Sequence, residues 1–529
     1  MILSAILYPL SSIYSASPHR LTRWLFLRLL GLIYLIAFVS LWVQLSGLIG
    51  SRGILPAADF LSAVYAQIGA QSYYLLPTLF WFNASDAFLQ FICGSGAVLS
   101  LLLIAGITPG PILLLLWTFY LSLTVVGQDF LAFQWDNLLL ETGFLAIFFA
   151  PWQLWPKLSE ETPPSLAWLW LLRWLLFKLI FSSGAVKLLS GDPTWRDLTA
   201  LTFHYETQPL PTWTSWTMHQ LPEWFQKTSV VVMFVIELAI PFLIFAPRRL
   251  RLMACATLVG LQLLIILTGN YAFFNWLTIA LCLLLLDDAF LRRWLPQRLT
   301  SQYSDVLRAS SEEMGRGSNG WNEVFSLFYP LDPKNPRPNL FTRVQQVLLL
   351  ALAIIIFLLS SAHVARLFVP LPRSVQQLMA WVAPFRTINS YGLFAVMTTT
   401  RPEIIIEGSN DGETWLAYEF KWKPGDPLRR PRFVAPHQPR LDWQMWFAAL
   451  DTYQNNPWLI NFMVRLLEGS PEVLALLDRN PFPDTPPRYV RAMLYLYHFT
   501  NFDSTQPNEA WWQREQRLQY APTLSLPNQ

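Results

Sequence analysis

The residues best placed to do chemistry stand in an otherwise apolar stretch, FQWDNLLLETGFLAIFFAPW at residues 133–152. Gln134, Asn137 and Glu141 are spaced i, i+3 and i+7, so they share one face of a helix, whereas Asp136 points nearly opposite. A carboxylate that faces lipid is costly, so we expect Glu141 to face the interior of a helical bundle. Three interpretations fit this pattern: a helix-packing contact, a substrate or proton site, and a position at the membrane interface.

Basic residues follow in the next apolar stretch, LLRWLLFKLIFSSGAVKLLSGDPTW. We interpret Arg173 as an anchor that snorkels to one membrane surface, and Lys178 as an available partner for a buried carboxylate. Lys187 stands near the other end, where it either snorkels to water or pairs with Glu141 or Asp192. The SSGA run between the two lysines lets a neighbouring helix approach closely.

The connection at residues 190–227 holds most of the remaining candidates. Its candidate binding residues are Asp192, Trp195, Arg196, His204, Tyr205, Glu206, Gln208 and His219. His204 beside Glu206 fits an acid/base pair or half of a metal site, but no HxxxH or HExxH spacing accompanies them, so we predict no metal. A structural cap of tryptophans and buried hydrogen bonds is the alternative. The tryptophans that match an aromatic membrane-interface belt are Trp195, Trp213, Trp216 and Trp224.

The composition of the 529-residue chain indicates what must position these groups. It is 53% hydrophobic and only 13% charged, against roughly 25% charged in soluble domains. A net charge of +3 gives no basic excess that would favour nucleic acid. The three cysteines, Cys93, Cys255 and Cys282, lie in apolar runs, so we expect no disulfide framework and no cysteine zinc site. No Walker loop or dinucleotide fingerprint is present, and no cofactor is predicted.

A helix that spans a bilayer needs about 20 apolar residues, because lipid offers the backbone no hydrogen-bond partners. The nine segments that meet this requirement are approximately 22–49, 86–106, 111–128, 137–155, 166–189, 228–246, 252–268, 271–287 and 344–369. The more polar stretch 56–82 is interpreted as an interfacial helix. The predicted fold class is therefore a polytopic α-helical membrane protein, with about nine transmembrane helices and a C-terminal extramembrane α+β domain.

Basic residues near the ends of these segments predict the orientation. Those that fall on one side if nine spans alternate are Arg20, Arg23, Lys157, Arg248, Arg249, Arg251, Arg292, Arg293 and Arg298. The amino terminus is thus predicted to be cytoplasmic, and the odd number of spans places the carboxyl terminus on the far side. The predicted domains are a transmembrane core at 1–288 with the far-side loop 190–227, a cytoplasmic linker at 289–343, a last transmembrane helix at 344–370 and an extracytoplasmic α+β domain at 371–529.

Within the far-side domain, EIIIEGSNDGETWLAYEFKWKPG predicts two strands around a turn, because polar and apolar residues alternate after the turn. LDWQMWFAALDTY, PWLINFMVRLLEG and SPEVLALLDRN predict short helices, the last with Ser470 as N-cap and Pro471 at its first position. RYVRAMLYLYHFT predicts a closing strand.

Three long strings carry a resemblance to a known family: FQWDNLLLETGFLAIFFAPW, RWLLFKLIFSSGAVKLLSGDPTWRDLTALTFHYETQPLPT and INSYGLFAVMTTTRPEIIIEGSNDGETW. In this order they closely resemble the lipase maturation factor family, over most of the chain. The resemblance implies a polytopic membrane protein whose animal relatives sit in the endoplasmic reticulum and help secreted lipases fold and assemble into active dimers. A weaker likeness links GAVKLLSGDPTW to vitamin K-dependent gamma-carboxylases, which have a lysine pair where this chain has Lys187 followed by Leu188.

Two hypotheses follow, and we favour the first. The chain is a non-enzymatic folding and assembly factor for an exported, lipase-like client, with the 403–422 hairpin as a candidate edge for an added client strand. Alternatively, it is a membrane-embedded enzyme or lipid- or quinone-binding protein, whose candidate catalytic residues are Glu141, Lys187, His204 and Glu206. In both, the partners include membrane lipid and exclude nucleic acid, and a bacterial inner membrane is the expected location.

Overall fold

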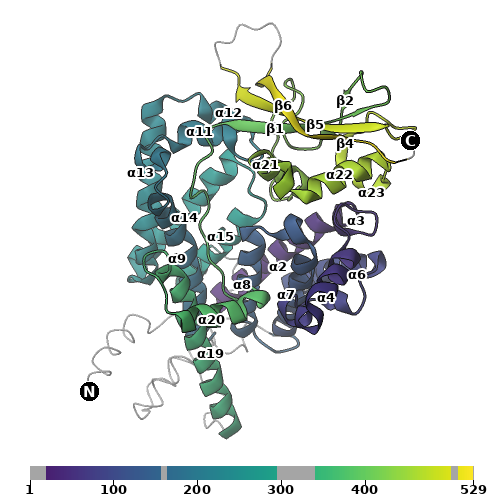
Figure 1. The fold of residues 1–529 in the computed structure, drawn as a ribbon. Helices are drawn as coiled ribbons and strands as arrows, with labels where there is room; N and C mark the ends of the chain where they lie inside the picture. Colours follow the sequence, from purple (N-terminus) through teal and green to yellow (C-terminus); the bar gives the residue numbers. More distant parts are fainter. Residues whose placement is uncertain (1–18, 157–163, 295–339, 502–509, 528–529) are drawn as a thin grey trace.

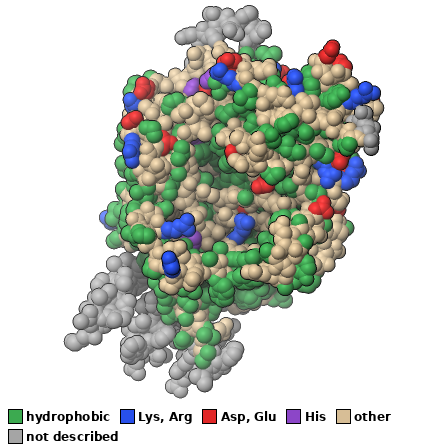
Figure 2. Space-filling view, viewed as in Figure 1, with side chains coloured by type: hydrophobic (Ala, Val, Ile, Leu, Met, Phe, Trp, Pro, Cys, Tyr) green, Lys and Arg blue, Asp and Glu red, His purple; other side chains and the backbone are tan. Residues whose placement is uncertain are grey.

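The computed structural model describes residues 19–156, 164–294, 340–501 and 510–527. A bundle of helices forms one part of the molecule, and an antiparallel sheet with three helices caps one end of it (Figure 1). On the face drawn in Figure 2, the acidic side chains lie toward the sheet end, and hydrophobic side chains dominate the lower end, around α19.

In the described residues, seven helical segments are long and apolar enough to cross a membrane. They are α2 (Arg20–Trp42), α6 (Asp86–Ala105), α7 (Pro109–Val126), α9 (Leu166–Leu189), α13 (Glu223–Leu238) with η4 (Ile240–Phe245), α14 (Arg248–Thr268) and α19 (Leu340–Ala365). These correspond to seven of the nine predicted spans. The protein is therefore an integral membrane protein.

The other two predicted spans are helices shorter than a bilayer is thick. They are α8 (Gln134–Phe149) and α15 (Phe274–Cys282), which η5 (Leu283–Leu285) extends. Both pack among the long helices, α8 against α7 and α9, and α15 against α14, α2 and α9. With 16 residues, α8 is too short to cross a bilayer as a regular helix perpendicular to it. The count of nine crossings thus stays a prediction for these two helices.

The helices alternate between two ends of the bundle. At the end under the sheet, Gln44 after α2 bonds the carbonyl of Gln438, and Asn270 after α14 bonds that of Arg432. At the opposite end, the amide of Arg20 donates to Asp288, which begins α16 (Asp288–Leu291). Seven and nine crossings are both odd, so either number leaves the start of α2 and the C-terminal domain on opposite sides.

The segment predicted as one interfacial helix at 56–82 is broken into short pieces. They are α4 (Ala57–Ile68), η1 (Gly69–Gln71), α5 (Ser72–Leu75) and η2 (Leu79–Trp81). Gly69 ends α4 with a φ of 58°, a left-handed conformation that glycine adopts without steric cost. The other short helices of the bundle are α3 (Leu45–Ile49), η3 (Gln128–Leu131), α10 (Pro193–Arg196), α11 (Ala200–Thr207), α12 (Trp213–His219), α20 (Arg373–Val382) and η6 (Ala383–Phe385).

The C-terminal domain is built on a four-stranded antiparallel sheet in the order β2-β1-β5-β6. The strands of both sheets are β1 (Arg401–Ser409), β2 (Leu416–Ala417), β3 (Glu419–Phe420), β4 (Leu477–Arg479), β5 (Tyr489–Phe499) and β6 (Trp512–Leu524). The accompanying helices are α21 (Arg440–Ala449), η7 (Tyr453–Asn455), α22 (Pro457–Leu467) and α23 (Pro471–Leu474). The prediction of an extramembrane α+β domain is confirmed in its secondary structure.

Two details of this domain differ from the prediction. The second strand of the predicted hairpin splits, because β2 pairs with β1 whereas β3 turns away to pair with β4. The predicted closing strand, β5, is an interior strand between β1 and β6. The edge strand β6 was not predicted, since its residues 513–519 are exposed on both faces and show no alternation of polar and apolar positions. Ser470 and Pro471 begin α23 as expected.

Candidate functional site

A partly buried, irregular segment packs against the bundle, where it contacts the polar residues of α8. We call residues 386–397 the strap; it leads from η6 toward β1 and has no helix or strand. It passes α9 so closely that a Cβ on Gly392 would come within 3.0 Å of Val186. Irregular backbone among membrane helices needs polar partners, because lipid supplies none.

Glu141 provides several of those partners. It is 2% exposed, and its carboxylate accepts hydrogen bonds from the backbone N–H of Asn389 (2.9 Å) and the hydroxyl of Tyr391 (2.7 Å). The Nζ of Lys178 lies 2.5 Å from the other carboxylate oxygen. Glu141 therefore faces the bundle interior as its helical position predicted, and its cation is Lys178, not Lys187.

The other two residues on that face of α8 also hold the strap. The Oε1 of Gln134 accepts from the backbone N–H of Gly392 (3.2 Å), and the Oδ1 of Asn137 accepts from Arg386 (2.9 Å). Asn389 donates in turn to the carbonyl of Asn137 (3.2 Å). The shared face that the i, i+3, i+7 spacing predicts thus exists, and its function in the structure is to bind a segment of the same chain.

Asp136, on the opposite face of α8, joins the bundle to the C-terminal domain. It is fully buried and accepts two hydrogen bonds from Arg440, at 2.9 and 3.0 Å. The hydroxyl of Tyr120 also donates to Asp136, and Arg440 donates to the carbonyl of Phe130 at 2.6 Å. Such a bidentate contact is short and directional, so it fixes α21 on the ends of α7 and α8.

Lys187 binds a residue that was not considered as its partner. Its Nζ lies 2.7 Å from the carboxylate of Glu237 on α13, and the lysine is only 4% exposed. The expectations that it snorkels or pairs with Glu141 or Asp192 are both wrong. Gly184 allows this contact, since a Cβ there would come within 2.9 Å of Glu237. The close approach predicted from the SSGA run is therefore present.

Arg173 is also buried where an exposed anchor was expected. It is 0% exposed, and its guanidinium donates to the carbonyl of Leu284 at 2.8 and 3.0 Å. That carbonyl stands at the end of α15, where η5 replaces regular helix. Arg173 thus supplies hydrogen-bond donors to a carbonyl at the end of a short helix within the bundle.

Asp192 connects the start of the 190–227 loop to the far end of the strap. It caps α10 by accepting from the N–H of Thr194 (2.8 Å), and it accepts from the N–H of Met397 (2.6 Å). Burial alone would raise the pKa of Asp192, but these hydrogen bonds outweigh it and lower the pKa. The neighbouring Trp195 is 2% exposed and donates from its indole to the carbonyl of Phe394 (2.9 Å).

The predicted pairing of His204 with Glu206 is not formed. The Nε2 of His204 lies 3.0 Å from the hydroxyl of Tyr271, which itself donates to Gln208 (2.9 Å). Burial, and then the charge of Lys187, lower the pKa of His204 to about 4, so the ring is neutral at pH 7.

Glu206 turns to the C-terminal domain instead. It accepts from the backbone N–H of Phe499 (2.9 Å), contacts His498 (3.2 Å) and lies 3.6 Å from His219. The bonds to Phe499 and His498 attach the loop to β5, and the contact with His219 lies within the loop. This arrangement agrees with the structural-cap interpretation of the loop.

The remaining loop candidates do not gather into one site. Arg196 is exposed, and Tyr205 is buried with its ring 5.9 Å from that of His204. Two of the four tryptophans predicted for an aromatic belt are held inside the protein, because Trp195 is buried and Trp216 donates to Thr500 (3.3 Å) of the C-terminal domain. The exposed members are Trp213 and Trp224.

Arg401, at the start of β1, connects the C-terminal domain to the 190–227 loop, and the sequence patterns do not predict this contact. It is 0% exposed and donates to the carbonyls of Glu206 (2.7 Å), Gln208 (2.5 Å) and Pro209 (3.0 Å). Its fourth partner is Glu403 at 2.6 Å. No local spacing predicts this contact, because its partners are backbone groups almost 200 residues away.

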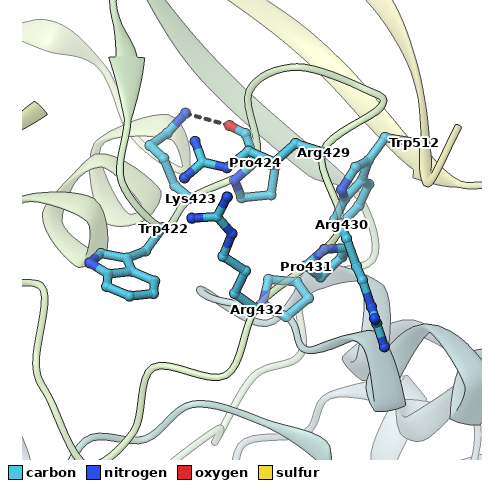
Figure 3. Close-up of a pocket in the computed structure, with 9 residues that line it drawn as sticks. Trp422, Lys423, Pro424, Arg429, Arg430, Pro431, Arg432 and Trp512 are labelled. Atoms are coloured by element: carbon cyan, nitrogen blue, oxygen red, sulfur yellow. Dashed lines mark hydrogen bonds between the residues drawn. The ribbon is translucent and has the colours of Figure 1, made fainter. Parts of the chain in front are cut away.

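A basic cleft lies beside this junction, lined in part by Trp422, Lys423, Arg429, Arg430 and Arg432 (Figure 3). Its volume is about 10 Å³, which is room for roughly one water molecule. Figure 3 shows Arg430 pointing away from the cleft, and this guanidinium stacks over Trp213 at 4.8 Å. Lys423 is paired with Glu403 at 2.8 Å. The cleft therefore has little room for a ligand.

The four candidate catalytic residues consequently belong to four separate contacts. Glu141 pairs with Lys178, Lys187 with Glu237, His204 with Tyr271, and Glu206 with β5. None of them lines the basic cleft or the larger apolar groove between α9 and α19. The geometry brings together the strap and its binding residues, and it does not bring together a catalytic set.

Two family profiles match consecutive parts of this chain. The lipase maturation factor transmembrane domain matches residues 21–293, and the lipase maturation factor C-terminal domain matches residues 387–522. The second match begins within the strap, whose binding residues on α8 lie in the first.

Curated relatives cover nearly all of the chain. It is 40% identical to lipase maturation factor 2 of Xenopus tropicalis and 38% identical to that of Homo sapiens, over 96% of this chain and 83% of each relative. It is 37% identical to lipase maturation factor 1 of Bos taurus, over 96% of this chain and 90% of that protein. No solved structure matches.

Proposed function

The chain belongs to the lipase maturation factor family, and from that premise we propose that it is a membrane-anchored factor that assists the folding and assembly of exported lipases. The relatives' names supply the lipase as client, and the membrane helices supply the anchor. We further propose that the C-terminal domain lies on the exported side of a bacterial inner membrane, where such a client would meet it.

The observation that supports this proposal is the open edge of β6. This strand has 13 residues and ends the sheet, and within the described part of the chain β5 is the one strand paired with it. Residues 513–519 are all exposed, and Figure 1 shows β6 at the side of the domain turned away from the bundle. An edge strand presents a row of unpaired N–H and C=O groups, which can accept another strand.

The hairpin at 403–422, the edge expected from the sequence, is less suitable. β1 is an interior strand, since β5 covers one side and β2 part of the other. β2 has only two residues, and the carbonyl of Ile404 is already bound by Lys423 at 3.1 Å. We therefore assign the proposed docking edge to β6 instead of the 403–422 hairpin.

Such an edge fits the needs of an immature lipase. A chain that has not finished folding or assembling exposes unpaired strands and apolar surface, and these lead to aggregation. Pairing of a client strand with β6 would cover one of these edges until assembly buries it. Main-chain hydrogen bonds carry most of the affinity in this binding mode, so several client sequences can use one edge.

The experiment places lysines on β6, because native proteins use lysines on edge strands to prevent the addition of another strand. Gln516→Lys combined with Leu518→Lys changes two exposed residues of β6. Leu416→Lys, on the two-residue edge strand β2 at the other side of the sheet, is the matched control. Each variant is co-expressed with a lipase exported by the same cell, and lipase activity is measured per amount of secreted lipase.

We expect the β6 variant to lower the specific activity of the secreted lipase, with unchanged amounts of the membrane protein, and the β2 variant to match the wild type. Equal lipase activity with both variants would overturn β6 as the docking edge. Deletion of the whole C-terminal domain is a poorer test, because the strap and Arg440 belong to the packing of the bundle.

A further inference from the structure

An apolar groove opens between α9 and α19, apart from the polar contacts described above. Its volume is about 360 Å³, within the range of roughly 300–1,000 Å³ typical of small-molecule pockets. All of its lining side chains are apolar or aromatic. Those that matter most are Ala167, Trp170 and Trp174 of α9, Phe245 of η4, and Ala353 and Phe357 of α19.

Aromatic rings hold the groove open at one end. The indole of Trp174 donates to Ser360 (3.2 Å) and contacts the ring of Phe357 (5.0 Å), which ties α19 to α9 there. Trp170 stacks flat on Phe245, with centroids 5.3 Å apart. Beyond these contacts the facing residues include the small side chains Ala167 and Ala353, which cannot fill the space between the helices.

Among the described residues nothing fills this space, and hydrocarbon is the occupant that fits its lining. An empty groove would lose the dispersion contacts of its whole lining. Water would lack the two to four polar partners that a buried molecule needs. Both flanking helices are membrane spans, and neighbouring α19 residues such as Ile355 and Leu358 are more than half exposed, so acyl chains surround the opening.

Basic residues follow the groove lining closely in the sequence. Phe245 belongs to its lining, and the chain continues directly to Arg248 and Arg249, which begin α14. Arg248 is paired with Asp287 (2.5 Å), whereas Arg249 is exposed. An arginine at a membrane surface suits the phosphate of a lipid headgroup.

We propose that the groove is a binding site for one acyl chain of a membrane phospholipid, whose phosphate lies at Arg249. The lipid fills the space that α9 and α19 leave, and it packs α19 onto the bundle. This matters for the rest of the molecule because α19 leads into α20 and the strap.

The test compares two identical substitutions on one helix. Ala353→Phe places a ring in the groove, whereas Ala351→Phe places the same ring at an exposed position of α19. The full-length chain is purified in mild detergent, mixed with anionic and zwitterionic phospholipids, and analysed by native mass spectrometry. Ala167→Phe fills the groove from the opposite helix and serves as the second variant if Ala353→Phe does not fold.

We expect the wild type and Ala351→Phe to retain one phospholipid per chain. Ala353→Phe and Ala167→Phe should lower this retention about tenfold, as overpacking of a filled site does. Arg249→Gln should keep the lipid and lose the preference for anionic headgroups. Equal retention by the groove variants and Ala351→Phe would overturn the site, and so would a wild type that retains a quinone or no lipid.

Discussion

The joint between the bundle and the C-terminal domain differs sharply from the outer edge of the same domain. At the joint, Arg440 and Asp136 form a buried, bidentate ion pair, with exposed fractions of 1% and 0%. At the edge, Arg517 and Glu515 of β6 also pair at 2.9 Å, but their side chains are 47% and 66% exposed. The two pairs have the same chemistry in different surroundings.

This difference separates residues that hold the molecule together from residues that are available to a partner. Ionisable residues inside membrane spans are functional candidates by default. Here the charged residues of α8 and α9 bind the strap, the C-terminal domain and neighbouring helices. The surface that we propose for a partner lies on β6, where the sequence contains no motif.

The largest expected effect breaks the joint and leaves the edge intact. Arg440→Ala would leave the carboxylate of Asp136 buried without its cation, which costs about 3–5 kcal/mol. We expect little folded protein and a strongly lowered melting temperature. Arg517→Ala is the matched control, because it removes an exposed ion pair worth at most about 1 kcal/mol.

The measurement is the thermal transition of each detergent-purified variant, together with its yield from membranes. If Arg440→Ala were as stable as Arg517→Ala, the ion pair would not hold the two parts together, and the comparison would lose its basis.

A smaller effect is expected at the strap. Glu141→Gln keeps an acceptor for Asn389 and Tyr391 but leaves Lys178 without a carboxylate, which we expect to cost about 2–3 kcal/mol. The double variant Glu141→Gln, Lys178→Met removes the unpaired charge and should regain part of the loss. Thermal melting of both variants measures this recovery.

The same pair of variants distinguishes packing from catalysis. If Glu141 acts only through packing, lipase maturation per amount of folded protein stays unchanged in the double variant. Loss of maturation in a variant with wild-type stability would instead assign Glu141 a direct role.

Helical periodicity was sufficient to predict which residues of α8 share a face, but not which parts of the chain each face contacts. The i, i+3, i+7 spacing correctly grouped Gln134, Asn137 and Glu141, and set Asp136 apart. The strap lies about 250 residues further along the chain, and Arg440 about 300. Such partners depend on the tertiary fold, and no local pattern contains them.

One wrong expectation was avoidable. Lys178 and Lys187 are nine residues apart in α9, which is two and a half helical turns, so they face opposite sides of the helix. Only one of them can meet α8, and the other must meet a different neighbour, which is α13. The edge strand β6 was a different case, because a strand exposed on both faces carries no period-two signal.

The smallest expected effect is a loss of stability at low pH, which arises at the joint between the bundle and the C-terminal domain. His437 bonds Ser40 of α2 at 2.9 Å, and burial, then Arg440 and Lys421, lower its pKa to about 4. The unfolded chain, with an ordinary pKa of 6.5, binds the proton first. The joint therefore loses stability as the pH falls from 6.5 toward 4, by at most about 1.4 kcal/mol per pH unit.

His437→Gln should remove part of this acid sensitivity, since a glutamine cannot take up the proton and can still bond Ser40. The check is the melting temperature of wild type and variant at pH 7.5 and at pH values of roughly 4.5 to 6.5, the window in which the two protonation states differ. Above that window both proteins should show a flat profile. Identical acid slopes for both would mean that His437 does not titrate at the joint, and that the joint owes its pH response to other groups such as His219.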